Sequence, residues 1–166
     1  MAHVVIDTSV RRLGELLQKK GFKLGLAESC TGGMLGERIT AATGASAYFL
    51  GGVISYDDRV KERVLGVPPA LIVENGAVSA ECALAMAHGV LQLLSAEVAV
   101  SITGVAGPDG GTAAKPVGLT YIAVVTPKSE RVEEYRWKGS RQANREQSVE
   151  AALALVINTL VGEYND

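Results

Sequence analysis

Three side chains that could act as nucleophiles or hydrogen-bond donors stand together at Ser29, Cys30 and Thr31. They follow an apolar run at 24–27 and precede a segment whose apolar residues recur at helical spacing. This order predicts a strand that turns directly into a helix, whose N-terminal N–H groups would stabilise an oxyanion or a phosphate. The two glycines that follow would cost a helix about 1 kcal/mol each, so they indicate close approach of a ligand or another segment. A simple helix cap fits the segment equally well, because capping needs only one Ser or Thr.

A serine nucleophile needs a base, and neither histidine is well placed to supply it. His3 lies near the N-terminus, and His88 falls in a long apolar helix expected at 79–94, where a core or interface position is the simpler interpretation. A Ser-His-Asp triad and a protein-held zinc site are therefore both disfavoured. Lys61 is the candidate base, because it follows the expected strand end at Tyr56 by little more than one helical turn. A lysine is a base only where its surroundings favour the neutral amine, and a solvated surface lysine is the alternative.

Two further segments offer groups that could hold an anion. The glycine-rich loop 103–111 follows an expected strand at 98–102, and it lacks both the Walker A lysine and the dinucleotide-binding spacing. The backbone N–H groups of such a loop can still hold an anion or a carbonyl oxygen, although a wide turn is the alternative. Arg141 and Arg145 lie one helical turn apart at the start of the last expected helix. This spacing suits a phosphate or carboxylate clamp, but surface arginines are a common explanation for it.

The apolar periodicity and the helix caps predict elements that alternate between helix and strand. Residues 47–56 carry apolar side chains on both faces, which indicates a strand in the centre of a sheet. We predict an α/β fold, a three-layer α/β/α sandwich around a mixed, mainly parallel central sheet. Ligands bind such sheets beyond the carboxyl ends of the strands, where the candidate segments would converge. The predicted helices cover 8–20, 29–44, 57–66, 68–75, 79–94 and 141–160, and the predicted strands cover 24–27, 47–56, 98–102, 119–125 and 131–137.

The composition limits the class of protein and its partners. The 166 residues suit one domain, 1–166, and the net charge of -2 argues against nucleic acid as a partner. The two cysteines are too few for a disulfide framework, so we expect a reducing cytoplasm. No apolar run approaches the roughly 20 residues that span a bilayer, so no membrane partner is expected.

Four segments together resemble the CinA C-terminal domain family, namely 27–33, 75–79, 101–111 and 115–118. The likeness runs over nearly the whole chain, and we expect the family's stand-alone form, since many relatives carry an additional N-terminal domain. Characterised members are nicotinamide mononucleotide (NMN) deamidases. The resemblance therefore implies hydrolysis of the NMN carboxamide to nicotinate mononucleotide and ammonia, without metal or organic cofactor, by a homo-oligomer.

The resemblance also implies which residues do the work. The family's Ser-Lys pair corresponds to Ser29 and Lys61, and Tyr56 would orient the lysine or pass a proton to the departing ammonia. One departure is the segment 56–61, Tyr-Asp-Asp-Arg-Val-Lys, where relatives often read Tyr-Ser-Asn-Glu-Ala-Lys; the additional acids bear on the protonation of the lysine. The implied residues for the oxyanion and the substrate are Thr31, Gly32, Gly33, Thr103, Gly104, Arg141 and Arg145.

Two alternatives stay open at this stage. Glu28, Cys30 and Lys61 provide the groups of a Cys-Glu-Lys amidase, and a thiolate is a stronger nucleophile than a hydroxyl. The chain could also be a non-catalytic module that binds or senses nucleotides. Ammonia release and alanine substitutions separate these possibilities.

Overall fold

The computed structural model describes residues 7–164. His3 lies outside this range. The elements in chain order are α1 (Thr8–Lys20), β1 (Leu24–Glu28), α2 (Met34–Thr40), the 3-10 helix η1 (Ala45–Ala47), β2 (Phe49–Ile54), α3 (Asp58–Arg63), α4 (Pro69–Asn75), α5 (Ala80–Leu94), β3 (Val98–Gly104), β4 (Leu119–Val125), β5 (Glu130–Arg136) and α6 (Arg141–Glu163).

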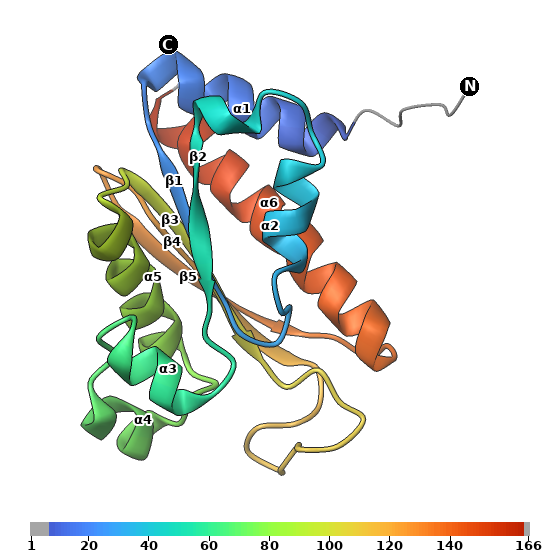
Figure 1. Ribbon diagram of the computed structural model, residues 1–166. Coiled ribbons are helices and arrows are strands. Elements are labelled where there is room, and N and C mark those ends of the chain that lie inside the picture. The colour runs from blue at the N-terminus through green and yellow to red at the C-terminus, as the bar shows by residue number, and fades with distance from the viewer. Residues whose placement is uncertain (1–6, 165–166) are drawn as a thin grey trace.

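A five-stranded sheet in the order β2-β1-β3-β4-β5 forms the middle layer. Strand β1 runs parallel to both β2 and β3, whereas β3, β4 and β5 pair in antiparallel fashion. Helices α1, α2 and α6 cover one face, and α5 with the short α3 and α4 lies on the other (Figure 1). The α/β/α sandwich around a mixed sheet is confirmed. Its parallel part makes up two of the four strand pairings in the described chain.

The two faces of the sheet differ in the size of their side chains. On β3, Val98, Val100 and Ile102 point toward α1, α2 and α6, whereas the smaller Ala99 packs toward α5. Helix α5 lies close to this small-residue face. The Ser101 hydroxyl donates to the carbonyl of Ala83, the fourth residue of α5, at 2.5 Å. Close packing of α5 holds the chain around α3, and with it the candidate base, against the sheet.

Local capping signals fix most helix boundaries where the sequence predicts them. The Asp7 carboxylate accepts hydrogen bonds from the second and third N–H groups of α1, and Gly21 ends that helix with φ 68°. Ser79 and Ser140 cap α5 and α6 in the same way, through their hydroxyl oxygens. Pro69 opens α4, which ends at Asn75.

The strand expected in the centre of the sheet lies at its edge, so that prediction is wrong. Strand β2 pairs with β1 alone, and a β-bulge near its start shifts the register by one residue, with Gly51 at φ 141°. Phe49 therefore packs with the α1, α2 and α6 cluster, whereas Val53 packs with the α5 cluster. Apolar residues point to both faces although the strand lies at the edge, and Leu50 and Ile54 are accordingly 46% and 56% exposed.

The segment 29–33 forms a turn and not the first turn of a helix. Helix α2 begins at Met34, because Gly32 and Gly33 take φ values of 58° and 99°, which an α-helix cannot include. The helix ends at Thr40 rather than near Gly44. The prediction of a helix that starts directly after β1 is therefore wrong.

Helix α5 is buried on one side only, and His88 lies on its exposed side. The side chain of His88 is 46% exposed, and its Nε2 lies 2.6 Å from a carboxylate oxygen of Glu130. The prediction of a core position for His88 is therefore wrong.

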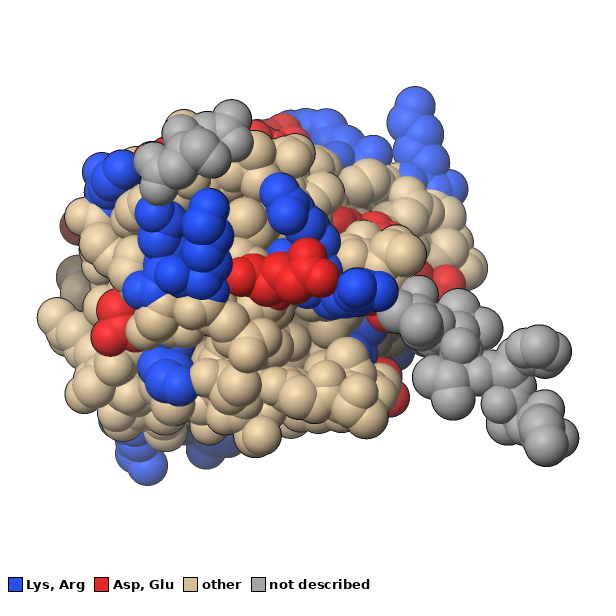
Figure 2. Space-filling model, turned by 90° about the horizontal axis from the view of Figure 1, so that it is seen from above, with Lys and Arg blue, Asp and Glu red and all other residues tan. Residues whose placement is uncertain are grey.

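The surface carries charges of both signs. Lys and Arg side chains lie next to Asp and Glu side chains on the face seen from above in Figure 2. Within residues 7–164, no helix is long and apolar enough to cross a membrane.

Candidate active site

A cavity of about 250 Å³ lies beyond the carboxyl ends of β1 and β3, where ligands bind in sheets with parallel strands. Its walls come from the turn after β1, the start of α3, the glycine-rich loop after β3 and the segment 77–78 before α5. Arg141 at the start of α6 adds a cation. Segments far apart in sequence thus meet at one edge of the sheet (Figure 1).

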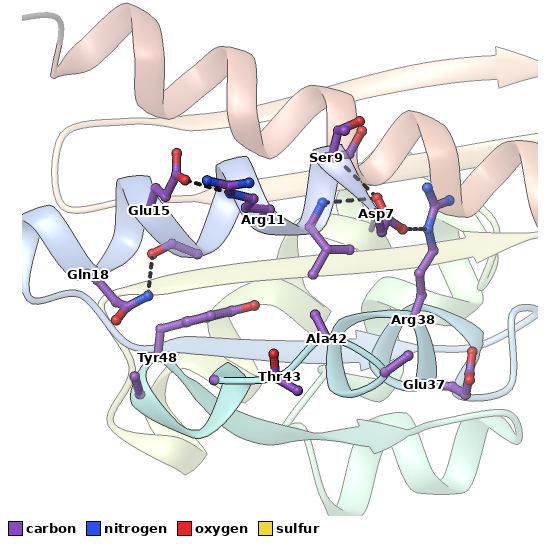
Figure 3. Close-up of a pocket in the computed structure, with 16 residues that line it drawn as sticks. Asp7, Ser9, Arg11, Glu15, Gln18, Glu37, Arg38, Ala42, Thr43 and Tyr48 are labelled. Carbon is purple, nitrogen blue, oxygen red and sulfur yellow. Dashed lines mark hydrogen bonds and ion pairs between the residues drawn. The ribbon is translucent and has the colours of Figure 1, made fainter. Parts of the chain in front are cut away.

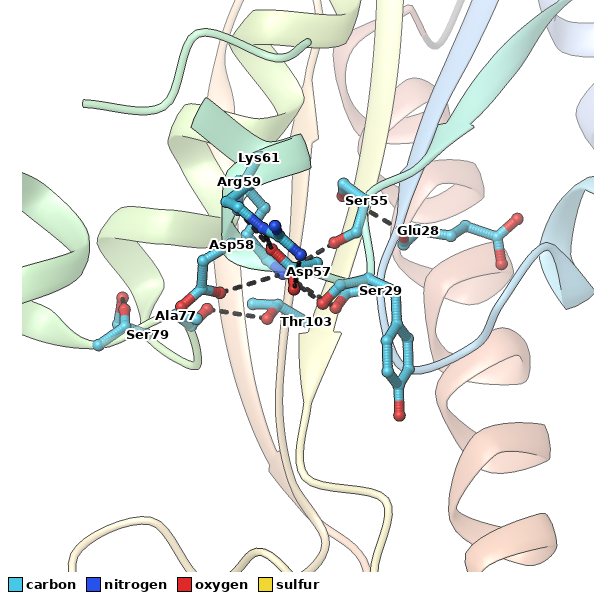
Figure 4. Close-up of polar contacts among 12 residues, drawn as sticks. Glu28, Ser29, Ser55, Asp57, Asp58, Arg59, Lys61, Ala77, Ser79 and Thr103 are labelled. Atoms are coloured by element: carbon cyan, nitrogen blue, oxygen red, sulfur yellow. Dashed lines mark hydrogen bonds and ion pairs between the residues drawn. The ribbon is translucent and has the colours of Figure 1, made fainter. Parts of the chain in front are cut away.

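Ser29 and Lys61 meet at this cavity. Ser29 follows the last residue of β1 directly, and its backbone N–H donates to the carbonyl of Ile102 on β3 at 3.0 Å. The Lys61 side chain reaches back from α3, and its Nζ donates to the Ser29 Oγ at 3.2 Å (Figure 4). Lys61 is only 1% exposed, so the alternative of a solvated surface lysine is excluded.

The surroundings of the Lys61 Nζ suit a group that exchanges one proton. The carbonyl oxygens of Ser55 and Tyr56 accept from it at 2.8 and 3.1 Å, and the Ser29 Oγ is its third neighbour at hydrogen-bond distance. An ammonium fills these three contacts with its three N–H groups. A neutral amine has two N–H groups for the two carbonyls and one lone pair, which would face the serine hydroxyl. The same geometry therefore accommodates both forms of a general base.

The groups of a Cys-Glu-Lys site are not assembled. Cys30 lines the cavity, but it is 7% exposed and packs in the hydrophobic cluster with α2 and α6, and burial raises the pKa of its thiol to about 11. The Glu28 side chain points away from Lys61 (Figure 4). Its carboxylate accepts from the Thr31 hydroxyl at 2.6 Å and from two backbone N–H groups of α2 at 2.9 and 3.0 Å. Glu28 thus anchors α2 beneath the turn, and Cys30 is held as a neutral thiol.

The three residues of the turn that were predicted to bind an oxyanion have structural contacts. Thr31 is fully buried, and its hydroxyl proton is donated to Glu28. Gly32 and Gly33 supply the left-handed backbone that reverses the chain before α2. In Gly33, an added Cβ would lie 3.1 Å from the Ile54 side chain, so the turn packs tightly on the end of β2.

The glycine-rich loop offers backbone N–H groups rather than the hydroxyl that was predicted. Thr103 is 1% exposed, and its hydroxyl donates to the carbonyl of Ala77 at 2.8 Å, so its proton is already used. At Gly104 an added Cβ would lie 2.6 Å from the Thr120 hydroxyl oxygen, which explains the glycine by the close approach of β4. Within the described chain, the cavity wall includes N–H groups that donate to no backbone or side-chain acceptor, among them those of Ala106, Gly107 and Gly110.

Tyr56 contributes its backbone to the lysine and its side chain to the rim. The Tyr56 carbonyl accepts from Lys61, but the phenol ring is directed elsewhere, and its hydroxyl accepts from the Arg141 Nη2 at 3.4 Å. The side chain is 62% exposed. Tyr56, which was predicted to orient Lys61 or to pass a proton to the ammonia, thus contacts the lysine through its carbonyl and not through its hydroxyl.

The two arginines have different tasks. The Arg141 guanidinium donates to the carbonyl of Gly107 at 2.8 Å and lines the cavity. Arg145 donates to the carbonyls of Cys30 and Thr31 at 3.0 and 3.1 Å and does not line the cavity. Arg141 is thus available to an anionic ligand, whereas Arg145 supports the turn that carries Ser29.

Several residues that shape the site were not predicted from the sequence. Ser55 is fully buried and presents its carbonyl to the lysine, and Asp58 lines the cavity with its carboxylate 3.6 Å from the Lys61 Nζ. Asn144 is 2% exposed and holds the carbonyl of Ala106 at 3.0 Å. Lys115, which follows the glycine-rich loop, donates to the carbonyls of residues 75 and 78 and so ties this part of the chain to the segment before α5. Of these four residues, only two could have been noticed in the sequence. Lys115 lies in a segment that carries the family likeness, and Asp58 lies in the segment 56–61 that departs from it.

A larger cavity of about 880 Å³ lies between α1 and α2, away from the Ser-Lys pair (Figure 3). Its charged side chains are paired with one another, as Arg38 is with Asp7 at 2.5 Å and Arg11 is with Glu15 at 3.1 Å. Neither a lysine nor a cysteine lines it. Within residues 7–164, no three His, Cys, Asp or Glu side chains are grouped so that they could hold a metal ion. The smaller cavity is therefore the candidate active site.

Comparison with known proteins identifies relatives over nearly the whole chain. The model of the CinA C-terminal domain matches residues 6–160. A CinA-like protein from Desulfotalea psychrophila is 47% identical over 150 residues, which cover 90% of this chain and 36% of that protein. A CinA-like protein from Geobacter sp. strain M21 is 53% identical over 134 residues, or 81% of this chain and 32% of that protein. The chain thus spans about a third of the length of the curated relatives it matches.

Solved structures of the same superfamily have the same fold. The competence/damage inducible protein CihA from Agrobacterium tumefaciens superposes with a TM-score of 0.88 at 37% identity, over 90% of this chain and 92% of that one. A CinA superfamily protein from Klebsiella pneumoniae superposes with a TM-score of 0.89 at 32% identity, over 93% and 96% of the two chains. The chain therefore belongs to the CinA C-terminal domain family.

Proposed function

We propose that this chain is a nicotinamide-nucleotide amidase that hydrolyses NMN to nicotinate mononucleotide and ammonia. The observation that carries the proposal is the buried Lys61 amine at 3.2 Å from the Ser29 hydroxyl, at the wall of a cavity. The cost of burying this amine is offset by three hydrogen-bond partners, and one of them is the hydroxyl of the proposed nucleophile. The family likeness supports the choice of reaction and substrate.

In the first half of the reaction, the Lys61 amine takes the proton of Ser29 as the serine oxygen attacks the carboxamide carbon. The backbone N–H groups of Ala106 and Gly107 are candidates for the oxyanion that forms. One such donor contributes about 3 to 4 kcal/mol to the transition state in comparable sites. The C–N bond then breaks, and the lysine ammonium gives its proton to the departing ammonia. The product of this half is an acyl-enzyme on Ser29.

In the second half, water attacks the acyl carbon and the Lys61 amine takes its proton. The ester bond to Ser29 breaks, and the ammonium returns the proton to the serine oxygen. The nicotinate nucleotide leaves and both residues regain their starting forms. No step of this scheme calls on a metal or an organic cofactor.

The size of the cavity supports entry of one end of the nucleotide. Its volume of about 250 Å³ lies just below the ~300 Å³ at which pockets enclose a whole drug-sized molecule. The nicotinamide end would enter, and the phosphate would stay at the rim near Arg141. A cytoplasmic location and a homo-oligomeric state are part of the same proposal.

An ammonia-release assay on NMN, beside NAD and nicotinamide, tests this function. We expect release from NMN, a fall of about 10⁴-fold in Ser29→Ala and nearly full activity in Cys30→Ala. Full activity in Ser29→Ala with loss in Cys30→Ala would overturn the choice of nucleophile. Tight binding of NMN without any ammonia would instead identify a binding module.

A further inference from the structure

Asp58 lies beside the amine that the proposed reaction uses as its base. Its Oδ1 is 3.6 Å from the Lys61 Nζ, and it lines the same cavity (Figure 4). The three hydrogen-bond positions of the amine are taken by the carbonyls of Ser55 and Tyr56 and by the Ser29 hydroxyl. Asp58 therefore acts on Lys61 through its charge and not through a hydrogen bond.

The neighbouring Asp57 carries the same charge but has a different task. Its carboxylate caps α3 by accepting from the Arg59 backbone N–H at 2.9 Å, and it pairs with the Arg59 guanidinium at 2.9 Å. It does not line the cavity. The two acids therefore form a matched pair, in which one faces Lys61 and the other faces solvent and an arginine.

The other groups packed around Lys61 leave Asp58 as the main negative charge. Cys30 and Cys82 approach from the turn after β1 and from α5, and burial raises the pKa of each thiol to about 11, so both are neutral. The Glu28 carboxylate points toward α2 (Figure 4). Arg141 is the cation of the cavity wall, and Asp109 lies on the same wall within the glycine-rich loop. Among the described residues, Asp58 is the one carboxylate within 4 Å of the amine.

We propose that Asp58 is the third member of the catalytic group, a positioning residue that sets the pH range in which Lys61 can accept the serine proton and stabilises the ammonium once it forms. This inference rests on the proposed function and deepens it. It extends to lysine the arrangement in which a nucleophile is paired with a base and the base with a third group. The proton moves only between Ser29, Lys61 and the leaving ammonia.

The charge has two opposite consequences for the rate. At low pH the carboxylate favours the ammonium, so it reduces the fraction of enzyme with a free base. At high pH, where the amine is neutral, the carboxylate stabilises the ammonium that develops in the transition state and so raises the rate. Removing the charge should therefore help at low pH and harm at high pH.

The test compares kcat/KM for NMN across pH in the unmodified chain, Asp58→Asn and Asp57→Asn. We expect Asp58→Asn to shift the rise of the profile to lower pH, and the shift should be modest because the Asp58 side chain is 53% exposed. Its plateau should fall by about three- to tenfold, so that the two curves cross. Asp57→Asn keeps a good helix cap, and because the Asp57 charge is paired with Arg59 it should shift the profile much less than Asp58→Asn does.

A second measurement separates this inference from the choice of substrate. Labelling of Ser29 by a fluorophosphonate reports the state of the serine and its base without NMN, and its pH dependence should shift in the same direction in Asp58→Asn. A shifted labelling profile with no hydrolysis of NMN would support the role of Asp58 and refute the proposed substrate. Unshifted profiles, or an equal loss of rate at every pH, would overturn the role of Asp58.

Discussion

The two cavities of this molecule differ in size and in the groups that surround their charged side chains. The larger, about 880 Å³ between α1 and α2, is lined by acids and arginines that pair with one another at its wall. The smaller, about 250 Å³, holds a lysine that is 1% exposed and surrounded by two carbonyls, a hydroxyl and a carboxylate. Ion pairs at the surface contribute little to stability and can form without special surroundings. A buried amine, by contrast, is stable only where hydrogen-bond partners or charges replace the water it has lost. The burial of the reactive group, and not the volume of the cavity, therefore identifies the site.

The largest expected difference between the cavities comes from removing one cation from each. Lys61→Met keeps the length of the side chain without the amine, and we expect kcat on NMN to fall by about 10⁴-fold, since a base has no substitute here. Arg38→Met in the larger cavity should leave kcat within about twofold, because the residue serves stability alone. Steady-state ammonia release checks both, with circular dichroism to show that each variant is folded. A comparable loss in a folded Arg38→Met would move the chemistry to the larger cavity.

The next effect separates the two arginines near the smaller cavity. Arg141→Gln should raise KM for NMN by about 10- to 100-fold, the amount expected for a lost charge-assisted contact to phosphate. Arg145→Gln should leave KM nearly unchanged and lower the melting temperature, because its guanidinium holds the carbonyls of Cys30 and Thr31. Kinetics with NMN and with its dephosphorylated riboside show whether Arg141 recognises the phosphate. If Arg141→Gln kept the full preference for NMN, the phosphate would have to bind elsewhere.

A smaller effect concerns stability, at the contacts of Glu28 with the turn after β1 and with α2. Glu28→Gln should lower the free energy of unfolding by about 1 to 3 kcal/mol, because the amide replaces an acceptor that faces three donors. Glu37→Gln is the control on the exposed side of α2, the helix that Glu28 anchors, and it should change stability by less than about 0.5 kcal/mol. Urea denaturation at pH 7 measures both. Equal effects of the two substitutions would show that the buried contacts of Glu28 do not matter.

The smallest effect lies in the larger cavity and depends on pH. The hydrogen bond and the charge of Arg38 hold the pKa of Asp7 below its ordinary value of 3.8. A lowered pKa in the folded state gives stability that is present above the unfolded value and is lost as pH falls through the folded one. Asp7→Asn keeps the cap of α1 and removes the charge, so it should cost about 1 kcal/mol or less at pH 7, and the difference should vanish toward pH 2. A constant difference between pH 7 and pH 2 in urea denaturation would refute the ionic origin.

The candidate site could be predicted in part, because its main residues stand at the ends of elements. Ser29 follows a short apolar strand and Lys61 lies in a capped short helix, and a sheet with parallel strands brings such ends together. The directions of the side chains could not be predicted. Thr103 gives its proton to Ala77, and the Tyr56 hydroxyl turns to Arg141, because those partners come from segments distant in the chain.

The sequence by itself determined most of the helix boundaries, the α/β class and the family. Asp7, Ser79 and Ser140 cap their helices through bonds that span two or three residues, so a short stretch of chain suffices to encode them. Only the tertiary structure decided that β2 lies at the edge of the sheet, that Lys61 is buried and that Arg141 rather than Arg145 faces the cavity. Each of these depends on which strands pair and how closely helices pack on them, and such contacts join residues far apart in the chain.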